Sequence, residues 1–359
     1  MAQTADYKLG EFTYGRGWYM IAQSGELGDK PLNLRYFGRD LVLYRGESGT
    51  PHLVNAYCPH MGAHIGKNTT SYIVLDGEQV QGESIRCPFH GWRFGPDGEC
   101  DDIAYCDHRP LPKVSLGTYP VIERAGVLWM WFDEEGNEPL FDLPAFEPYD
   151  DPNWAKWNID DLGELEQHPV EIVDNMTDAA HFIPIHGSKD IQVFYNEMDG
   201  HVMWQIFSAG HRTLVEEGVG TLDVETWYTG PSILQAKMHG TFPTHMLIAH
   251  TPVEDGKIHV WHGLMVQFDH IPSDEDRAMA RAYEQESCRA FGQDFEIWQN
   301  KRPCLKPMMV KGDGPTNKGR LWYRQFFNPV GQAGEFHARV NGRHVTIDNR
   351  TQGDIQAAE

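Results

Sequence analysis

Two short stretches, Cys58-Pro59-His60-Met61-Gly62 and Cys87-Pro88-Phe89-His90-Gly91-Trp92, decide how the chain folds around its chemistry. Each stretch places a histidine two or three positions after a cysteine, and a glycine within two positions of that histidine. This pattern is typical of a tight loop rather than of a helix or strand. The two loops together offer two thiolates and two imidazoles, enough to hold one metal centre.

Two kinds of centre use two cysteines and two histidines: a tetrahedral zinc ion, and a [2Fe-2S] cluster with both cysteines on one iron and both histidines on the other. Zinc sites usually pair like ligands within each loop. Here each loop is mixed, which favours the second kind, the Rieske cluster. The expected ligands are Cys58, His60, Cys87 and His90, and a structural zinc site is the alternative.

From Gly17 to Asp133 the sequence alternates short apolar segments with turns, which predicts an all-β domain carrying both loops at strand connections. The expected strands are Trp18–Ala22, Asp40–Tyr44, His52–Ala56, Tyr72–Leu75, Ser84–Cys87, Gly117–Glu123 and Val127–Phe132. An acidic, proline-rich stretch, Glu134–Pro152, then indicates a domain boundary. We therefore expect one domain over residues 1–145 and a second over residues 146–359.

A second chemical stretch, Glu164–His186, reads E-L-E-Q-H-P-V-E-I-V-D-N-M-T-D-A-A-H-F-I-P-I-H. Pro169 suits the first turn of a helix, and Pro184 forbids its continuation. The predicted helix therefore ends near His181, and His186 follows in the loop.

On that helix Asp174, Asp178 and His181 stand at i, i+4 and i+7, so that one face carries two carboxylates and an imidazole. A lone helical histidine is usually structural, but two histidines that flank a helix end beside acids are rarer. We interpret His181 and His186 as two ligands of a 2-His-1-carboxylate site, which leaves positions open on Fe(II) for O2.

Between Val202 and Asp269, long alternating runs joined by an Asp255-Gly256 turn predict an antiparallel sheet. Its many aromatic and methionine side chains suit the lining of a large apolar cavity, although each one alone is more often ordinary core. The sheet also carries five histidines that we expect to be core or surface residues rather than ligands: His239, His245, His250, His259 and His262.

The carboxylate ligand comes from a third stretch, Asp274–Asn300, which is rich in helix formers and predicts one long helix. Asp294 falls on the apolar face of this helix, one turn before Trp298, whereas Glu296 points off that face. Burying a carboxylate is costly unless a cation compensates, and Fe(II) would do so. Asp294 is therefore the expected third ligand, and spacing alone leaves Asp178 open as the alternative.

Three phrases carry a resemblance to a known family: C-P-H-M-G-A-H at 58–64, I-R-C-P-F-H-G-W-R at 85–93 and D-G-E-C-D-D-I-A-Y at 97–105. With the D-x-x-H-x(4)-H spacing of Asp178–His186, they resemble the terminal oxygenase components of Rieske non-heme iron oxygenases, and in particular the 3-ketosteroid 9α-hydroxylase oxygenases. The resemblance implies an α+β fold. An N-terminal all-β Rieske [2Fe-2S] domain would precede a C-terminal helix-grip (START-like) catalytic domain, in which a curved antiparallel sheet wraps a long helix.

One departure from the family's pattern is the spacing between the loops. Twenty-six residues, 61–86, separate His60 from Cys87, which is more than the family usually has. The excess, within Asn68–Glu78, predicts an added hairpin with Asp76-Gly77 at its turn.

The resemblance implies a terminal oxygenase that uses O2 to hydroxylate a large hydrophobic substrate such as a 3-ketosteroid. Its electrons would come from an NADH-dependent flavin and iron-sulfur reductase or a ferredoxin, since no G-x-G-x-x-G fingerprint for a dinucleotide is apparent after a strand. The resemblance also places the third iron ligand on a D-x-E-I-W segment, here at Asp294. It gives Asp178 a catalytic role between His181 and a cluster histidine, His90, of a neighbouring subunit, which implies a homotrimer.

Other functions stay open. A Rieske oxygenase could instead act on an aromatic substrate, by ring hydroxylation or O-demethylation, or desaturate a sterol. The chain could also be an electron carrier whose C-terminal domain only binds a lipid-like ligand, or a zinc-stabilised binding protein.

The composition limits which binding partners and which cellular compartment we expect. The 52 acidic and 30 basic residues give a net charge of -22, which disfavours nucleic acid and anionic lipid as partners. No apolar run of about 18 residues could span a membrane, and the N-terminus lacks the pattern of a secretory signal. The six cysteines are too scattered to suggest a disulfide framework, so we expect a cytoplasmic protein.

Overall fold

The structure, a computed structural model, describes residues 2–67, 70–75, 77–107, 113–210, 222–240 and 242–350. The chain divides into two compact units, one of Trp18–Asp142 and one of Met1–Gly17 with Leu143–Glu359. The boundary between Asp142 and Leu143 falls close to the domain boundary expected at residue 145. Residues 1–17, however, belong to the later unit. Backbone hydrogen bonds from Phe12 to Phe327 and from Arg16 to Phe326 tie this N-terminal segment in place.

The unit Trp18–Asp142 contains, among its described residues, only strands and one short 3-10 turn, η1 (Ser24–Glu26), as the sequence predicted. The strands pair in the orders β1-β11-β10, β2-β3-β4-β9 and β5-β6-β7-β8. The first Cys-His loop follows β4, and the second joins β6 to β7. The strands are β1 (Gly17–Gln23), β2 (Leu32–Tyr36), β3 (Arg39–Arg45), β4 (Pro51–Asn55), β5 (Val80–Gln81), β6 (Ser84–Arg86), β7 (Trp92–Phe94), β8 (Cys100–Ile103), β9 (Thr118–Tyr119), β10 (Val121–Arg124) and β11 (Val127–Phe132).

Two strand predictions differ from the structure. The single strand predicted at Gly117–Glu123 is divided at Pro120 into β9 and β10, which belong to different sheets, and the strand predicted at Tyr72–Leu75 is absent. Tyr72–Leu75 forms bends instead. The hydroxyl of Ser71 accepts hydrogen bonds from the N–H groups of Ile73 and Val74 and donates one to the carbonyl of Pro88, which bends the backbone here. The predicted turn residue Asp76, like residues 68 and 69, lies outside the described residues. From 70 to 79, the residues that are described include no strand, so the predicted hairpin finds no support there.

The second unit is built on one large antiparallel sheet. Over the described residues it has nine strands, in the order β12-β19-β18-β17-β16-β15-β14-β20 with β13 also pairing with β19. β18 and β19 meet at the predicted Asp255-Gly256 turn, where Glu254 faces Lys257 and Gly256 has a φ of 85°. The strands are β12 (Trp154–Ala155), β13 (Asp160–Leu165), β14 (Lys189–Asp199), β15 (Val202–Gly210), β16 (Leu222–Thr229), β17 (Ile233–His239), β18 (Pro243–Glu254), β19 (Lys257–Gln267) and β20 (Gly342–Asp348).

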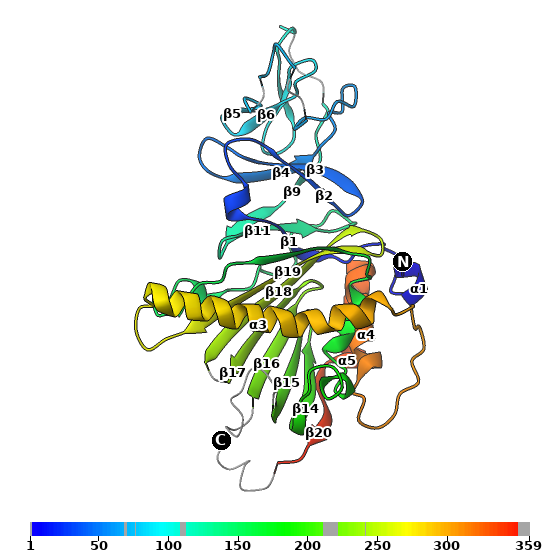
Figure 1. Cartoon of the computed structure of the whole chain (residues 1–359). Helices are drawn as coiled ribbons and strands as arrows, with labels where there is room; N and C mark the ends of the chain where they lie inside the picture. The colour runs from blue at the N-terminus through cyan, green and yellow to red at the C-terminus, as the bar shows by residue number, and fades with distance from the viewer. Residues whose placement is uncertain are drawn as a thin grey trace. The chain divides into compact units, whose positions relative to one another are not determined.

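The long helix α3 (Asp274–Gln299) lies across one face of this sheet (Figure 1). It begins where the sequence predicts, because the hydroxyl of Ser273 accepts the N–H of Asp276, whose carboxylate in turn accepts the N–H of Ser273. Helix and sheet form the expected helix-grip arrangement, and the fold is α+β. No helix of the described ranges is long and apolar enough to span a membrane. The other helices are α1 (Thr4–Tyr7), α2 (Val170–Asn175), α4 (Thr316–Arg324), α5 (Ala333–Val340), and the 3-10 turns η2 (Glu147–Tyr149), η3 (Ala180–Phe182), η4 (Gln325–Phe327) and η5 (Val330–Gln332).

The helix predicted to reach His181 is shorter than expected. α2 ends at Asn175, and His181 lies in the separate turn η3. The carboxylate of Asp178 accepts the N–H groups of Ala180 and His181, so it opens the second turn instead of continuing the first helix. The shared helical face predicted for the two aspartates and His181 is therefore wrong.

Candidate metal centres

The two Cys-His loops share one backbone design. In the first loop the N–H of Gly62 donates to the carbonyl of Cys58 at 2.9 Å, and in the second the N–H of Gly91 donates to the carbonyl of Cys87 at 3.0 Å. The two glycines have φ angles of 74° and 72°, in the left-handed region that favours glycine. The tight loops predicted from the sequence are confirmed.

The four side chains expected to hold the cluster converge. The thiols of Cys58 and Cys87 are buried and in hydrogen-bonding contact, and neither forms a disulfide. The rings of His60 and His90 lie 4.8 Å apart between centroids. Nδ1 of His60 is buried and makes no hydrogen bond to a described residue, which leaves it available as a ligand.

Backbone N–H groups contact both sulfur atoms. The N–H groups of His60 and Met61 contact the sulfur of Cys58, and those of Phe89 and His90 contact the sulfur of Cys87. The hydrogen bond with the Cys58 thiol, helped by these N–H groups and opposed by burial, lowers the pKa of Cys87 to about 6. Such hydrogen bonds stabilise thiolate ligands and tune the reduction potential of a cluster. The donor set and its surroundings fit a Rieske cluster.

Large apolar side chains surround these loops and are exposed. Phe89 packs against His90 with 3.8 Å between ring centroids, and the exposed Tyr105 accepts a hydrogen bond from Trp92. The segment between the loops adds Ile73, which lies beside Gly91. Exposed apolar groups that lie close together are typical of surfaces that contact another molecule. We call this set the cluster rim; its exposed members are Met61, Tyr72, Ile73, Phe89 and Tyr105.

A second donor set forms in the other unit. His181 from η3, His186 from the loop after it, and Asp294 from α3 offer ligand atoms that all lie within 4.8 Å of one another. Nε2 of His186 is 3.4 Å from Oδ2 of Asp294. Asp294 is only 6% exposed, whereas Glu296 is exposed. The structure thus brings together three residues that the sequence singled out from two distant stretches.

Each histidine of this set is oriented by a hydrogen bond at its other nitrogen. Nδ1 of His181 lies 2.6 Å from the backbone carbonyl oxygen of Asp178, and Nδ1 of His186 lies 3.2 Å from Oε1 of Gln293. Because carbonyl oxygens only accept, both Nδ1 atoms carry a proton, which leaves Nε2 of each ring as the nitrogen that would bind a metal. Asp294 raises the pKa of His186, so metal binding at Nε2 of this ring competes with a proton. Burial also lowers the pKa of His181, which favours its neutral, ligating form. Sequence reasoning missed Gln293, because an exposed helical glutamine carries no signal of its own.

The two aspartates of the same stretch have different surroundings. Oδ1 of Asp178 lies 3.9 Å from Nδ1 of His181, and its side chain is partly exposed. Asp174 is buried in an ion pair with Arg320 and is no part of this donor set.

An apolar cavity adjoins the second donor set. The cavity has a volume of about 160 Å³, is partly open to solvent, and is lined mostly by apolar side chains. The walls come from α2, η3, α3 and the strands β15 to β18, and they include His181, His186 and Asp294 themselves. Phe207, Met238 and Met246, three of the sheet residues considered as possible lining, do line it.

Fold and donor sets together define a class: oxygenases that combine a Rieske domain with a mononuclear non-heme iron domain. Comparison with known families agrees. Residues 17–120 match the Rieske [2Fe-2S] domain, and residues 130–327 match the 3-ketosteroid 9alpha-hydroxylase C-terminal domain. The chain belongs to the 3-ketosteroid 9α-hydroxylase family of Rieske oxygenases.

Individual relatives and solved structures are similar to this chain in sequence or in fold. It is 33% identical to a 3-ketosteroid-9-alpha-monooxygenase, oxygenase component, of Rhodococcus rhodochrous, over 88% of this chain and 82% of the relative. It is 29% identical to cholesterol 7-desaturase nvd of Bombyx mori, over 88% and 70%. In fold it is similar to NdmA of Pseudomonas putida CBB5 with caffeine (TM-score 0.71, 16% identity, 93% and 97% covered) and to dicamba monooxygenase bound to dicamba (0.61, 17%, 92% and 100%).

These findings confirm the predicted enzyme class and cofactors. The chain is the oxygenase component of a Rieske non-heme iron monooxygenase and uses a [2Fe-2S] cluster with a mononuclear iron. As one component of several, it takes its electrons from a separate reductase or ferredoxin.

Proposed function

We propose that this oxygenase hydroxylates a 3-ketosteroid or a similarly large, apolar polycyclic substrate. The observation that carries the proposal is the apolar cavity that opens onto His181, His186 and Asp294. The Rhodococcus relative named for ketosteroid oxidation and the Bombyx relative named for cholesterol desaturation both support a steroid skeleton.

We propose that His181, His186 and Asp294 hold the iron, and that Cys58, His60, Cys87 and His90 hold the cluster. When bound, the two groups supply one-electron transfer and the reductive activation of O2. The residues of this chain do the rest. Gln293 and the carbonyl of Asp178 fix the tautomers of the two histidines, and the apolar walls exclude water and hold the substrate against the open side of the site.

We further propose that the working unit is a cytoplasmic homotrimer, in which electrons pass between neighbouring chains. The partly exposed carboxylate of Asp178 would lie between His181 and His90 of the partner subunit. The cluster rim supports this proposal, because an apolar surface of this kind is suited to burial against another chain.

Turnover of a steroid panel tests the function. The loaded protein, a surrogate reductase and NADH are incubated with each steroid under isotopically labelled O2, and products are read by mass. We expect NADH consumption that depends on the steroid and a product heavier by one labelled oxygen atom. Equal O2 consumption with and without steroid would contradict the proposal.

A variant separates this function from an electron carrier with a passive binding domain. His186→Ala should abolish the oxygenated product while the cluster remains reducible by the reductase. An electron carrier would be indifferent to this change.

A further inference from the structure

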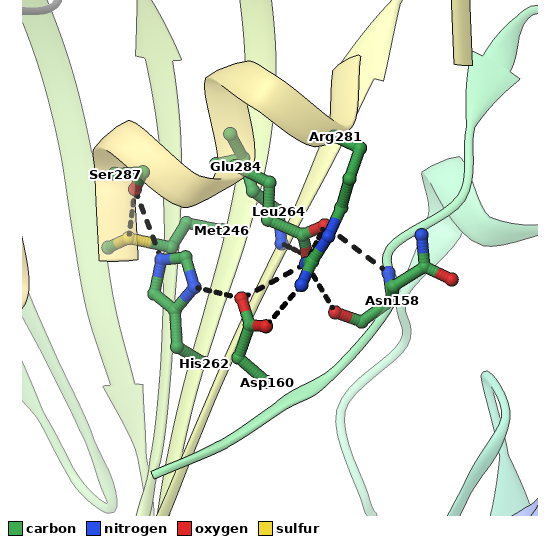
Figure 2. A network of polar contacts seen from close by, with 8 residues as sticks. All are labelled: Asn158, Asp160, Met246, His262, Leu264, Arg281, Glu284 and Ser287. Atoms are coloured by element: carbon green, nitrogen blue, oxygen red, sulfur yellow. Dashed lines mark hydrogen bonds and ion pairs between the residues drawn. The ribbon is translucent and has the colours of Figure 1, made fainter. Parts of the chain in front are cut away.

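A chain of polar side chains connects α3 with the neighbouring strands of the sheet (Figure 2). It starts at Ser287, which lines the cavity and whose Oγ lies 3.1 Å from Nε2 of His262 on β19. Nδ1 of His262 lies 3.9 Å from Oδ2 of Asp160 on β13. Arg281 then binds both oxygens of Asp160, at 2.5 and 3.1 Å, and also the buried Glu284 at 2.7 Å.

This arrangement fixes the proton on His262. The ring is fully buried, and burial lowers its pKa although Asp160 opposes the shift, so the imidazole is neutral near pH 7. Of its two nitrogens, Nδ1 makes no hydrogen bond to a described residue but faces the carboxylate of Asp160 at 3.9 Å. His262 and Arg281 together lower the pKa of Asp160, and Arg281 holds this carboxylate in place. The N–H dipole is favoured on the side of the carboxylate, so Nδ1 carries the proton and Nε2 is an acceptor.

The tautomer of His262 decides whether the hydroxyl of Ser287 donates or accepts a hydrogen bond in the cavity. Its hydroxyl has two acceptors in reach, Nε2 of His262 at 3.1 Å and the sulfur of Met246 at 3.7 Å. A thioether is the weaker acceptor, so the hydroxyl proton points to His262. Ser287 therefore presents lone pairs, rather than a proton, to a molecule in the cavity.

The position of Ser287 suits a substrate anchor. It lies seven residues before Asp294 on the same helix, which at about 1.5 Å per residue is roughly 10 Å along the helix axis. One end of an elongated polycyclic molecule could thus meet Ser287 while another part lies at the iron ligands. The cavity is otherwise lined largely by apolar side chains.

A metal site is a weaker interpretation of the same residues. Asp160, His262 and Cys288 do offer ligand atoms within 4.8 Å of one another. The guanidinium of Arg281, however, already occupies both oxygens of Asp160 and places a positive charge beside the position a cation would take. The geometry suits the positioning of His262 better than it suits a cation.

We infer that Ser287, positioned by His262 and Asp160, accepts a hydrogen bond from a hydroxyl group of the substrate. The inference rests on the proposed steroid oxygenase function. It narrows the substrate class to polycyclic molecules, 3-ketosteroids among them, that carry a hydroxyl group rather than a ketone at the end that meets Ser287. Ser287 contacts the substrate, whereas His262 and Asp160 act through it as positioning residues.

Binding of three steroids on one saturated androstane skeleton tests the inference. The probes are the 3,17-diketone and the two alcohols in which one of the ketones is replaced by a hydroxyl group. Dissociation constants are measured by calorimetry on the loaded oxygenase without reductase. We expect one of the alcohols to bind roughly threefold to tenfold more tightly than the diketone, the contribution of one hydrogen bond.

Two variants separate recognition from structure. Ser287→Ala should reduce this preference to within about twofold. Asp160→Asn should reverse it. The amide oxygen keeps one of the two hydrogen bonds from Arg281, at the position of Oδ1, and the NH2 group takes the position of Oδ2 that faces Nδ1. Nε2 then carries the proton, and Ser287 donates to a ketone. The control Ser273→Ala removes a serine hydroxyl at the far end of the same helix and should leave the preference unchanged.

The outcomes distinguish this inference from the proposed function. If all three steroids bind but Ser287→Ala leaves the alcohol preference intact, or if no preference exists, the role of Ser287 is overturned and the steroid oxygenase stands. If none of the three binds the wild-type protein, the steroid function is overturned together with the inference.

Discussion

Burying an ionised carboxylate costs several kcal/mol unless donors or a cation compensate. Asp294 is 6% exposed and faces His186 at 3.4 Å, while His181 completes the same group. Asp294 raises the pKa of His186, so a cation is already favoured beside this carboxylate. A divalent metal ion bound by the two imidazoles and the carboxylate would supply that positive charge.

Replacing Asp294 by asparagine should therefore weaken iron binding but leave the cluster in place. The substitution keeps the shape but removes the charge, so we expect iron affinity to fall by at least tenfold, with loss of turnover. Iron and acid-labile sulfide per chain are the measurements, because the cluster should remain. Glu296→Gln is the matched control, since Glu296 is exposed on the same helix and should retain both metals. Full iron content in the Asp294→Asn protein would remove Asp294 from the ligand set.

Glu284 gives a second prediction. Burial, partly offset by Arg281 and the N–H of Leu264, raises its pKa from 4.5 to about 7. Because the folded state then binds the proton more tightly than the unfolded state, the free energy of unfolding falls as pH rises between these values. From pH 5 to pH 8 the loss should be about 2.5 kcal/mol larger for wild type than for Glu284→Gln. Denaturant unfolding at both pH values measures the difference, and identical losses in the two proteins would refute it.

Local spacing made some site residues predictable and others not. The two Cys-His loops needed only short motifs, and Asp294 only a carboxylate on an apolar helix face. Asp160, His262 and Ser287 come from β13, β19 and α3, and nothing in the sequence pairs them. His262 was judged an ordinary sheet histidine, and only the tertiary structure shows what it contacts.

Among the elements, α2 shows how a short helix is held in place. Arg320 on α4 binds Asp174 at the end of α2 through Nε and Nη2, and the carbonyl of Cys304 through Nη1. Both charged side chains are largely buried. Because α2 leads directly into η3, this ion pair also sets where the chain begins its path to His181.

Removing one partner of this pair should be costly. Arg320→Ala leaves the carboxylate of Asp174 buried without its cation, so we expect the free energy of unfolding to fall by about 3 to 5 kcal/mol. Arg289→Ala is the control, since Arg289 is exposed and its ion pair among the described residues is with Glu286 on the same helix. Its loss should cost less than about 1 kcal/mol. Urea unfolding compares the two. A similar small loss in both variants would show that the buried pair contributes little.

Long elements with clear cap or turn residues were the easiest to predict from the sequence. The long helix α3 and the β18–β19 hairpin carry strong caps and turns, and both were predicted correctly. Four strands of the first unit were missed. Three of them, β5, β7 and β8, have only two to four residues, which give little alternation to detect, and the fourth is the five-residue β2. The strand predicted at Tyr72–Leu75 had the right apolar pattern, but the side chain of Ser71 redirects its backbone.

For the molecule as a whole, the two units carry different halves of one reaction. The proposed cluster ligands belong to Trp18–Asp142, and the proposed iron ligands belong to the unit that contains Leu143–Glu359. Electrons must therefore pass between units, either within one chain or between neighbouring chains. The cluster rim favours the second route, because it exposes apolar groups beside the cluster histidines.

Mixed oligomers distinguish the two routes. One chain carries Cys58→Ser, which removes a cluster ligand, and the other carries Asp294→Asn, which removes an iron ligand; each alone should be inactive. If electrons cross between chains, a trimer assembled at random from equal amounts has a working cluster beside a working iron at about one interface in four, so activity should recover to about a quarter of wild type. If transfer stays within one chain, no mixture recovers activity, because every chain lacks one of its two centres. Turnover of the co-expressed mixture, with size-exclusion chromatography to verify assembly, gives the answer.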